Sequence, residues 1–141
     1  MALICRPAQP HDAASILTLA QTFASSFVIE PAAFQQTFSA LLADTHIHLA
    51  VAEQKQHLIG YLLGFVHPTF YANGPVAWVE EITISAADRR QGVGRLLMLD
   101  FERWAAKRGA NLVALATRRA APFYQALGYQ ESATYFRKLR A

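Results

Sequence analysis

The sequence predicts an α/β fold in which helices cover both faces of one mixed, mostly antiparallel sheet. Three segments with strand-type patterns follow one another between residues 46 and 84, and the short connections between them favour antiparallel pairing. A helical pattern and another buried strand come next, at a spacing typical of a parallel crossover connection. The length of 141 residues and the hydrophobic content of 53% favour one folded domain over residues 1–141.

The first third of the chain predicts one strand and two helices. Residues 3–6 form a short opening strand, which Pro7 ends. Asp12 is placed to cap a helix whose apolar residues recur at helical spacing. A second helix begins at Pro31, since proline suits the first turn of a helix. We expect these two helices to cover one face of the sheet together.

The middle of the chain predicts the antiparallel strands. Apolar and polar residues alternate over residues 46–53, and a turn at 54–57 leads into a strand over 58–66. This pair predicts a β-hairpin. A loop at 68–75 then precedes a strand over 76–84.

The last third predicts helices and strands in alternation. A helix over residues 92–108 carries a buried apolar stripe, and Gly109 suits its C-terminal cap. A buried strand at 112–116, a helix at 120–127 and a closing strand at 129–139 follow. The predicted element order is therefore β-α-α-β-β-β-α-β-α-β.

Charge divides the chain into two unlike parts. Residues 1–88 contain two basic and seven acidic side chains, a net charge of −5. Residues 89–141 contain eleven basic and three acidic side chains, a net charge of +8. This asymmetry indicates an anionic partner, either nucleic acid or a phosphorylated cofactor.

The turn around Gly92 and Gly94 joins a predicted strand to a predicted helix. Glycine lets a ligand approach the backbone closely, and unpaired N–H groups at the start of a helix attract anions. A diphosphate fits here, with Arg89, Arg90 and Arg95 adding positive charge. The turn lacks the Lys-Ser/Thr of a P-loop and the third glycine of a dinucleotide fingerprint, and by itself it is equally compatible with an ordinary tight turn.

Two segments of the chain resemble the signatures of one known family. Residues 89–94, Arg-Arg-Gln-Gly-Val-Gly, resemble the Arg/Gln-x-x-Gly-x-Gly/Ala signature of the GNAT superfamily of acyl-CoA-dependent N-acyltransferases. Residues 120–129, Ala-Ala-Pro-Phe-Tyr-Gln-Ala-Leu-Gly-Tyr, resemble its second signature, Ala-x-x-Phe-Tyr-x-x-x-Gly-Phe/Tyr. The element order agrees as well, so the resemblance covers essentially the whole chain.

The resemblance implies a GNAT-type fold whose fourth and fifth strands splay apart around the pantetheine arm of CoA. It also implies direct transfer of an acetyl group from acetyl-CoA, the co-substrate, to a primary amine. The pantetheine arm would pair with the backbone of the fourth strand, and the diphosphate with the amides of residues 91–96. The residues implied for acetyl-CoA binding are Ile82, Thr83, Ile84, Arg89, Arg90, Gln91, Gly92, Val93, Gly94, Arg95, Leu96 and Tyr124.

Tyr124, Glu80 and Glu81 are the candidate catalytic residues. Tyr124 matches the tyrosine that often protonates the departing CoA thiolate in relatives, although a packing role on a short helix remains an alternative. Adjacent strand residues face opposite sides, so only one glutamate can point into the cleft and help to remove the proton of the amine. Glu80 is favoured because carboxylates recur at its place in relatives, but a β-bulge would reverse this choice.

The acidic first 88 residues predict a cationic acceptor amine, because they supply most of the expected acceptor side. Two other functions stay open. One is a CoA-binding sensor or partner subunit without turnover. The other is a basic nucleic-acid-binding module, which would need exposed aromatic residues or a recognition helix among its basic residues. We expect neither nucleic acid nor membrane as a partner.

The remaining residue types predict no further chemistry. Cys5 is the only cysteine and has no base beside it in the sequence, so it is not expected to be a nucleophile. His46 and His48 are interpreted as solvent-facing, and no metal is expected. No segment approaches the roughly 20 apolar residues that span a bilayer, which predicts a soluble, cytoplasmic protein. A homodimer remains an alternative, because an exposed final strand often supports dimers in such folds.

Overall fold

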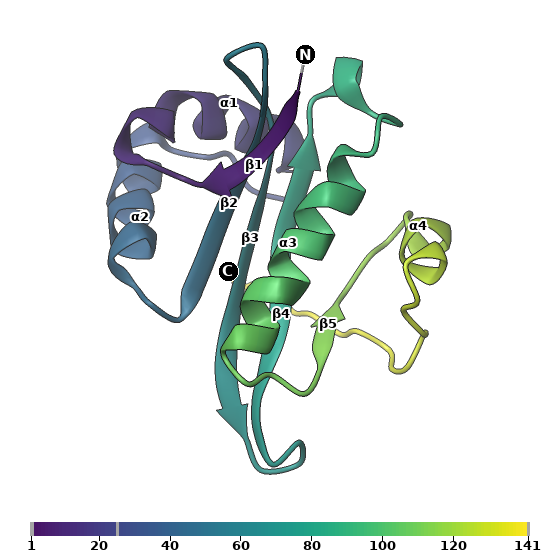
Figure 1. Cartoon of the computed structure of the whole chain (residues 1–141). Helices are drawn as coiled ribbons and strands as arrows, with labels where there is room; N and C mark the ends of the chain where they lie inside the picture. The colour runs from purple at the N-terminus through teal and green to yellow at the C-terminus, as the bar shows by residue number, and fades with distance from the viewer. Residues whose placement is uncertain (1, 25, 141) are drawn as a thin grey trace.

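The computed structural model describes residues 2–24 and 26–140, and it places helices on both faces of one sheet (Figure 1). The strands lie in the order β1-β2-β3-β4-β5, and neighbours are antiparallel except β4 and β5, which are parallel. The predicted α/β fold class is confirmed. The elements are β1 (Leu3–Pro7), η1 (Pro10–Asp12), α1 (Ala13–Phe23), α2 (Pro31–Ala43), β2 (Ile47–Gln54), β3 (His57–Thr69), β4 (Gly74–Ile84), η2 (Ala86–Asp88), α3 (Val93–Lys107), β5 (Val113–Leu115) and α4 (Ala121–Ala126).

No helix in the described part of the chain has both the length and the apolar character needed to cross a membrane.

Two hairpins build the antiparallel part of the sheet. β2 and β3 are joined by a tight turn in which Lys55 and Gln56 have positive φ angles of 54° and 64°. β3 and β4 remain paired as far as Thr69 and Gly74, so they extend into the predicted loop at 68–75. The hydroxyl of Thr69 donates a hydrogen bond to the Gly74 carbonyl at 2.7 Å, which closes this second turn.

The closing strand predicted over residues 129–139 is wrong. Residues 130–140 are exposed and form no strand, and this tail passes behind β4 in the view of Figure 1. Arg137 donates a hydrogen bond to the Ser26 hydroxyl at 3.1 Å, on the α1–α2 connection. An alternating pattern produces a strand only where a neighbouring edge of matching length is available, and β5 contributes only three residues to the sheet.

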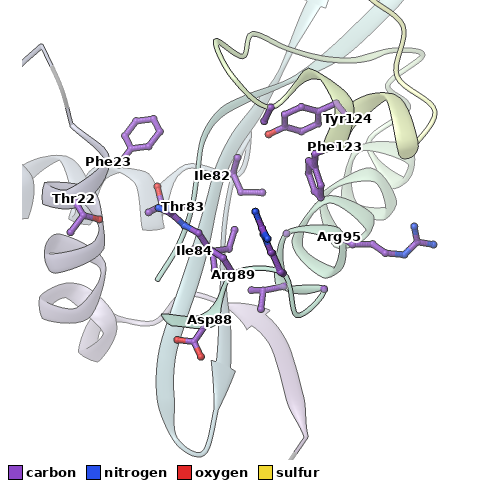
Figure 2. Close-up of a pocket in the computed structure, with 15 residues that line it drawn as sticks. Thr22, Phe23, Ile82, Thr83, Ile84, Asp88, Arg89, Arg95, Phe123 and Tyr124 are labelled. Carbon is purple, nitrogen blue, oxygen red and sulfur yellow. The ribbon is translucent and has the colours of Figure 1, made fainter. Parts of the chain in front are cut away.

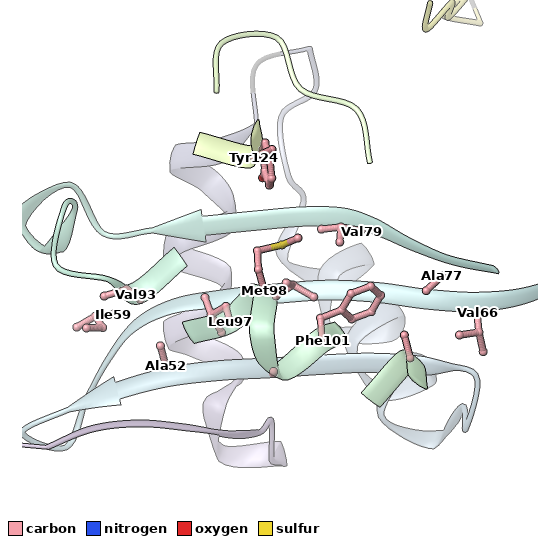
Figure 3. Close-up of a cluster of buried hydrophobic side chains, with 13 residues drawn as sticks. Ala52, Ile59, Val66, Ala77, Val79, Val93, Leu97, Met98, Phe101 and Tyr124 are labelled. Atoms are coloured by element: carbon pink, nitrogen blue, oxygen red, sulfur yellow. The ribbon is translucent and has the colours of Figure 1, made fainter. Parts of the chain in front are cut away.

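Alternating side chains of β2 divide between two hydrophobic cores. Leu49 and Val51 face α1 and α2, whereas Ala50 and Ala52 face α3. The core under α3 is the larger of the two and is shown in Figure 3. The sheet is therefore buried on both faces, as the predicted helices on both sides require.

Asp12 is the N-cap residue of α1, as the sequence predicts, but its carboxylate makes no hydrogen bond to the helix. Its carboxylate accepts hydrogen bonds from Arg6 at 2.8 Å and from the backbone N–H of Gln9 at 2.7 Å. The same guanidinium donates to Glu53 at 2.9 Å. The Arg6 side chain holds the pKa of Asp12 below its ordinary value, so the carboxylate stays charged. Two of the acidic residues in the first part of the chain thus share one arginine, and the three side chains together keep a net charge of −1.

The prediction of solvent-facing histidines is right for His46 and wrong for His48. His46 is exposed, just before β2. His48 lies on the α3 face of β2, where its Nε2 atom is 2.7 Å from an Asp100 oxygen. Its ring also stacks on Trp104 with a centroid distance of 5.0 Å. The difference arises because α3 covers this face of the strand and supplies a polar partner.

Gly64 leaves the space that Phe101 fills between α3 and the sheet. A Cβ atom at Gly64 would lie 2.3 Å from one ring carbon of Phe101 and 2.6 Å from another. Phe101 is fully buried and belongs to the core shown in Figure 3. This close approach of β3 and α3 fixes the helix on the sheet, and with it the position of the N-terminus of α3.

Replacing Gly64 by alanine should therefore lower the free energy of unfolding by about 1–3 kcal/mol, as overpacking in a close-packed core does. Urea unfolding of Gly64→Ala, Phe101→Leu and the double variant measures this effect. Because leucine removes the ring atoms that clash, the double variant should lose less stability than the two single losses combined. Wild-type stability in Gly64→Ala, or strictly additive losses, would contradict the packing described.

Candidate functional site

A cavity of about 420 Å³ opens where β4 continues beyond the end of β5 (Figure 2). Its walls come from the end of α1, the last residues of β4, the turn before α3, the first turn of α3 and the region of α4. The residues that line it are Thr22, Phe23, Ile82, Thr83, Ile84, Asp88, Arg89, Arg90, Gly92, Val93, Gly94, Arg95, Ala120, Phe123 and Tyr124.

β4 has a strand partner on only one side along this cavity. Its pairing with β5 ends at Val79 and Leu115, whereas its pairing with β3 continues to Ile84. Among the described residues, the backbone groups of residues 80–84 that face away from β3 therefore have no strand partner. These groups form an open edge, which matches the splayed fourth and fifth strands of a GNAT-type fold.

The N-terminus of α3 presents backbone N–H groups at the cavity. Gly92 is the N-cap residue, with a φ angle of 82°, and no side chain caps the helix there. The first hydrogen bond of the helix runs from the Leu96 N–H to the Gly92 carbonyl at 3.0 Å. The N–H groups of residues 93–95 therefore have no partner within the helix, and they lie at the positive end of its dipole. Such a helix start suits an anionic group.

Most of the residues predicted to bind acetyl-CoA lie together at this cavity. The exceptions are Gln91 and Leu96, which do not line it. The Leu96 N–H is also used within α3, so the prediction that its amide faces the diphosphate is wrong. Arg89, Arg90 and Arg95 line the cavity, although Figure 2 shows the end of the Arg95 side chain extending away from it. Acetyl-CoA binding by these residues stays a prediction.

The sequence reasoning did not assign five lining residues: Thr22, Phe23, Asp88, Ala120 and Phe123. Thr22 and Phe23 end α1, far from β4 in the sequence, so no local pattern could place them here. Phe123 lies within the second signature and could have been found there. A Cβ atom at Gly94 would be 3.1 Å from the Phe123 ring, so α4 packs closely against the first turn of α3.

Tyr124 lies on α4 at the cavity wall and is 8% exposed. Its ring contacts Phe123 and Tyr129 edge to face, with centroid distances of 4.9 and 6.0 Å. Figure 2 shows the hydroxyl pointing across the cavity toward β4. Burial raises the pKa of Tyr124, so the phenol keeps its proton at neutral pH and can donate a hydrogen bond.

A β-bulge determines how the two candidate glutamates are directed. The register of β3 and β4 shifts between Leu63 and Gly64, which leaves Glu80 as the additional residue of β4. Glu80 is exposed, whereas Glu81 is half-buried and accepts a hydrogen bond from the Tyr61 hydroxyl at 2.7 Å. Neither glutamate lines the cavity. The sequence-based preference for Glu80 rested on carboxylates at its place in relatives, and the bulge that could reverse this choice is present.

Cys5 lies in β1, outside the cavity. Burial, and secondly the nearby Asp100 carboxylate, raise the pKa of its thiol to about 12. Such a thiol is almost entirely protonated at neutral pH and is a poor nucleophile. Among residues 2–24 and 26–140, no three His, Cys, Asp or Glu side chains come together in a group that could hold a metal ion.

Several solved structures share this fold. A transcriptional regulator from Bacillus halodurans has a TM-score of 0.88 and 22% identity over 99% of this chain and 100% of its own. Glucosamine-6-phosphate N-acetyltransferase from Arabidopsis thaliana has a TM-score of 0.88 and 14% identity over 99% of both chains. The aminoglycoside N-acetyltransferase AAC(6')-Iy, solved in complex with CoA, has a TM-score of 0.86 and 20% identity over 99% of this chain and 96% of its own. At these identities the likeness shows the fold.

A search of curated protein sequences gave no match. The model of the family described as "Acetyltransferase (GNAT) family" matches residues 14–129. This range includes β4, the glycine turn, α3 and the second signature, and it covers well over half of the chain. The chain therefore belongs to the GNAT acetyltransferase family, which consists of acyl-CoA-dependent N-acyltransferases.

Proposed function

We propose that this chain transfers the acetyl group of acetyl-CoA to a primary amine that carries positive charge. The cavity beside β4 is the observation that carries the proposal, because it combines three features that this reaction needs. These features are an open strand edge, free amides at a helix N-terminus, and a buried, protonated tyrosine. Calorimetric titration with acetyl-CoA, followed by detection of the CoA thiol released on addition of amines, tests the proposal directly.

The pantetheine arm would lie along the open edge of β4, because its amide groups can pair there as a neighbouring strand would. Ile82 and Ile84 contribute apolar side chains to this wall. The diphosphate would accept hydrogen bonds from the free N–H groups of residues 93–95, with Arg89 and Arg90 adding charge. The neighbour AAC(6')-Iy, solved with CoA, supports this assignment through its shared fold.

The reaction requires the acceptor to lose a proton before it attacks. Deprotonating an alkylammonium at pH 7 costs about 4–5 kcal/mol, so a nearby carboxylate or an ordered water must help. The amine nitrogen then forms a bond to the thioester carbonyl carbon, and the bond from that carbon to sulfur breaks. Tyr124 would give its proton to the departing thiolate, since its hydroxyl lies at the cavity and stays protonated at neutral pH. The nitrogen, which carries one proton too many after its attack, would return a proton to the Tyr124 oxygen, so that the products are the neutral amide and the CoA thiol.

The charges near β4 support a cationic acceptor. Arg6 forms ion pairs with both Asp12 and Glu53, which leaves a net charge of −1 on these three side chains. α1 and α2, which cover the sheet on the expected acceptor side, contain no charged side chain. Glu80 and Glu81 add negative charge beside the open edge, and Asp88 lines the cavity itself, so this region would attract an ammonium group.

Replacing Gly94 by glutamate should weaken acetyl-CoA binding by at least about tenfold, because a carboxylate would stand beside the amides proposed to hold the diphosphate. Calorimetry measures the affinity, and circular dichroism checks the fold, since the new side chain also crowds Phe123. Ala106→Glu adds the same charge at an exposed site near the other end of α3 and should bind as the wild type does. Unchanged affinity in folded Gly94→Glu would place the diphosphate elsewhere.

Replacing Tyr124 by phenylalanine should lower kcat by at least about tenfold, because general acid catalysis of this kind typically contributes 10²–10⁴ in rate. The substitution keeps the edge-to-face ring contacts and removes only the hydroxyl. We therefore expect nearly unchanged acetyl-CoA affinity and melting temperature. Full kcat in the variant, or a loss of stability large enough to explain the lower rate, would assign Tyr124 to packing alone.

A panel of amines tests the charge of the acceptor. It contains spermidine, kanamycin and a lysine peptide as cations, a neutral aromatic amine, and glucosamine 6-phosphate and aspartate as amines that carry negative charge. We expect the cations to give the highest kcat/KM, and this preference should weaken as added salt screens the glutamates. Consistently higher kcat/KM for the neutral or anionic amines would exclude the cationic acceptor.

A further inference from the structure

The bulge at Glu80 changes which face of the sheet the last side chains of β4 point to. Before the bulge, Ala77 and Val79 face the core under α3. After it, Ile82 and Ile84 pack against that core. Glu81, which directly precedes Ile82 in the strand, therefore faces the side of the sheet that α1 and α2 cover. Without the additional residue, strict alternation would turn Glu81 toward the apolar core under α3, where an ionised carboxylate is costly.

On this side of the sheet, Tyr61 of β3 meets Glu81. The Tyr61 side chain is 1% exposed, and its hydroxyl donates a 2.7 Å hydrogen bond to a Glu81 carboxylate oxygen. Burial, and secondly the charge of Glu81, raise the pKa of Tyr61, so the hydroxyl remains a donor over the physiological range. The carboxylate is thus held by a side chain that has little freedom to move.

The surroundings give Glu81 no other titratable partner within the described residues. α1 packs against β4 and has no titratable side chain, and Glu80, the adjacent carboxylate, is exposed. Thr83 lies opposite Tyr61 in the strand register and lines the cavity. Its buried hydroxyl makes no well-formed hydrogen bond in the described part of the chain, but it lies close enough to the Tyr61 hydroxyl to oppose slightly the rise of the Tyr61 pKa. Glu81, Tyr61 and Thr83 therefore form a polar path that leads to the cavity wall.

We propose that Tyr61 is a positioning residue for acetyl transfer, and that its hydroxyl holds the Glu81 carboxylate as the group that accepts the proton of the amine. The inference rests on the proposed function and deepens it by choosing between the two glutamates. The ammonium proton passes to a Glu81 oxygen, directly or through one water molecule. The freed lone pair of the amine then attacks the thioester. Tyr61 keeps its own proton throughout, because it acts only through Glu81.

The pH dependence of kcat tests this role, measured with saturating acetyl-CoA and the best amine of the panel. A hydrogen bond donated to a carboxylate favours its ionised form, so its removal makes the carboxylate easier to protonate. In Tyr61→Phe, the low-pH limb of the profile should move toward higher pH. kcat at neutral pH should fall severalfold, whereas acetyl-CoA affinity should not change.

Tyr129→Phe is a matched control, because Tyr129 also donates a hydrogen bond to a glutamate, Glu102, at 2.6 Å. Glu102 lies on α3, on the opposite face of the sheet from the core under α1 and α2 to which Tyr61 belongs. The control removes the same chemical contact and should leave the low-pH limb where it is in the wild type. A limb that moved equally in both variants would overturn the inference, since it would then report a general effect on the fold.

Glu81→Gln tests whether Tyr61 acts through Glu81. This variant keeps a carbonyl acceptor for the Tyr61 hydroxyl, so it also serves if Tyr61→Phe folds poorly. The pH profile of Glu81→Gln should lack the low-pH limb. The double variant with Tyr61→Phe should have the same kcat as Glu81→Gln alone, because the two residues act as a unit. The inference would be overturned if Glu81→Gln kept the low-pH limb of the wild type, or if Tyr61→Phe lowered kcat as much in the double variant as it does alone.

The same experiments separate this inference from the proposed function. Wild-type protein that neither binds acetyl-CoA nor acetylates any amine of the panel would overturn both. Wild-type activity together with an unshifted limb in Tyr61→Phe would overturn only the role of Tyr61. Loss of the limb in Glu80→Gln, with its retention in Glu81→Gln, would assign proton removal to the other glutamate.

Discussion

The arrangement of the site depends on one constraint, the additional residue that Glu80 introduces into β4. A shift of one residue exchanges the two faces of every later position in a strand. Ile82 and Ile84 therefore join the core under α3, while Glu81 faces Tyr61. β4 continues past the end of β5. Among the described residues, the part of its backbone without a second strand partner is therefore the part after the bulge, where the side chains have changed faces. The bulge therefore gives the end of β4 apolar side chains on one face of the sheet and polar side chains on the other, beside its open backbone edge.

Helix α3 links the stability of the fold to the site. Its middle is anchored by Phe101, which fills the space left by Gly64, and its N-terminus supplies the free amides at the cavity. A helix is stiff over this length, so packing at one end determines where the other end lies. Close packing of Phe123 against Gly94 adds a second constraint on the same turn. The position of the amides proposed to bind the diphosphate is thus a consequence of core packing.

The charge asymmetry of the chain becomes informative only after pairing is considered. Arg6 binds two of the acids in the first 88 residues, and Asp100 is paired with His48 on the opposite side of the sheet. The acids beside the open edge of β4 and its cavity are Glu80, Glu81 and Asp88. The net charge of the first 88 residues led to the prediction of a cationic acceptor, but the distribution of free charge depends on contacts between elements that are distant in the sequence.

The sequence alone was sufficient for the fold class, because hydrophobic periodicity and turn residues are local properties, and for the glycine turn and Tyr124, which lie in recognisable motifs. It failed for the strand over residues 129–139, since strand formation also requires a partner edge. It could not choose between Glu80 and Glu81, because a bulge is defined by the register between two strands. Tyr61, Thr22 and Phe23 were likewise brought to this region by tertiary structure, which joins residues that no local pattern connects.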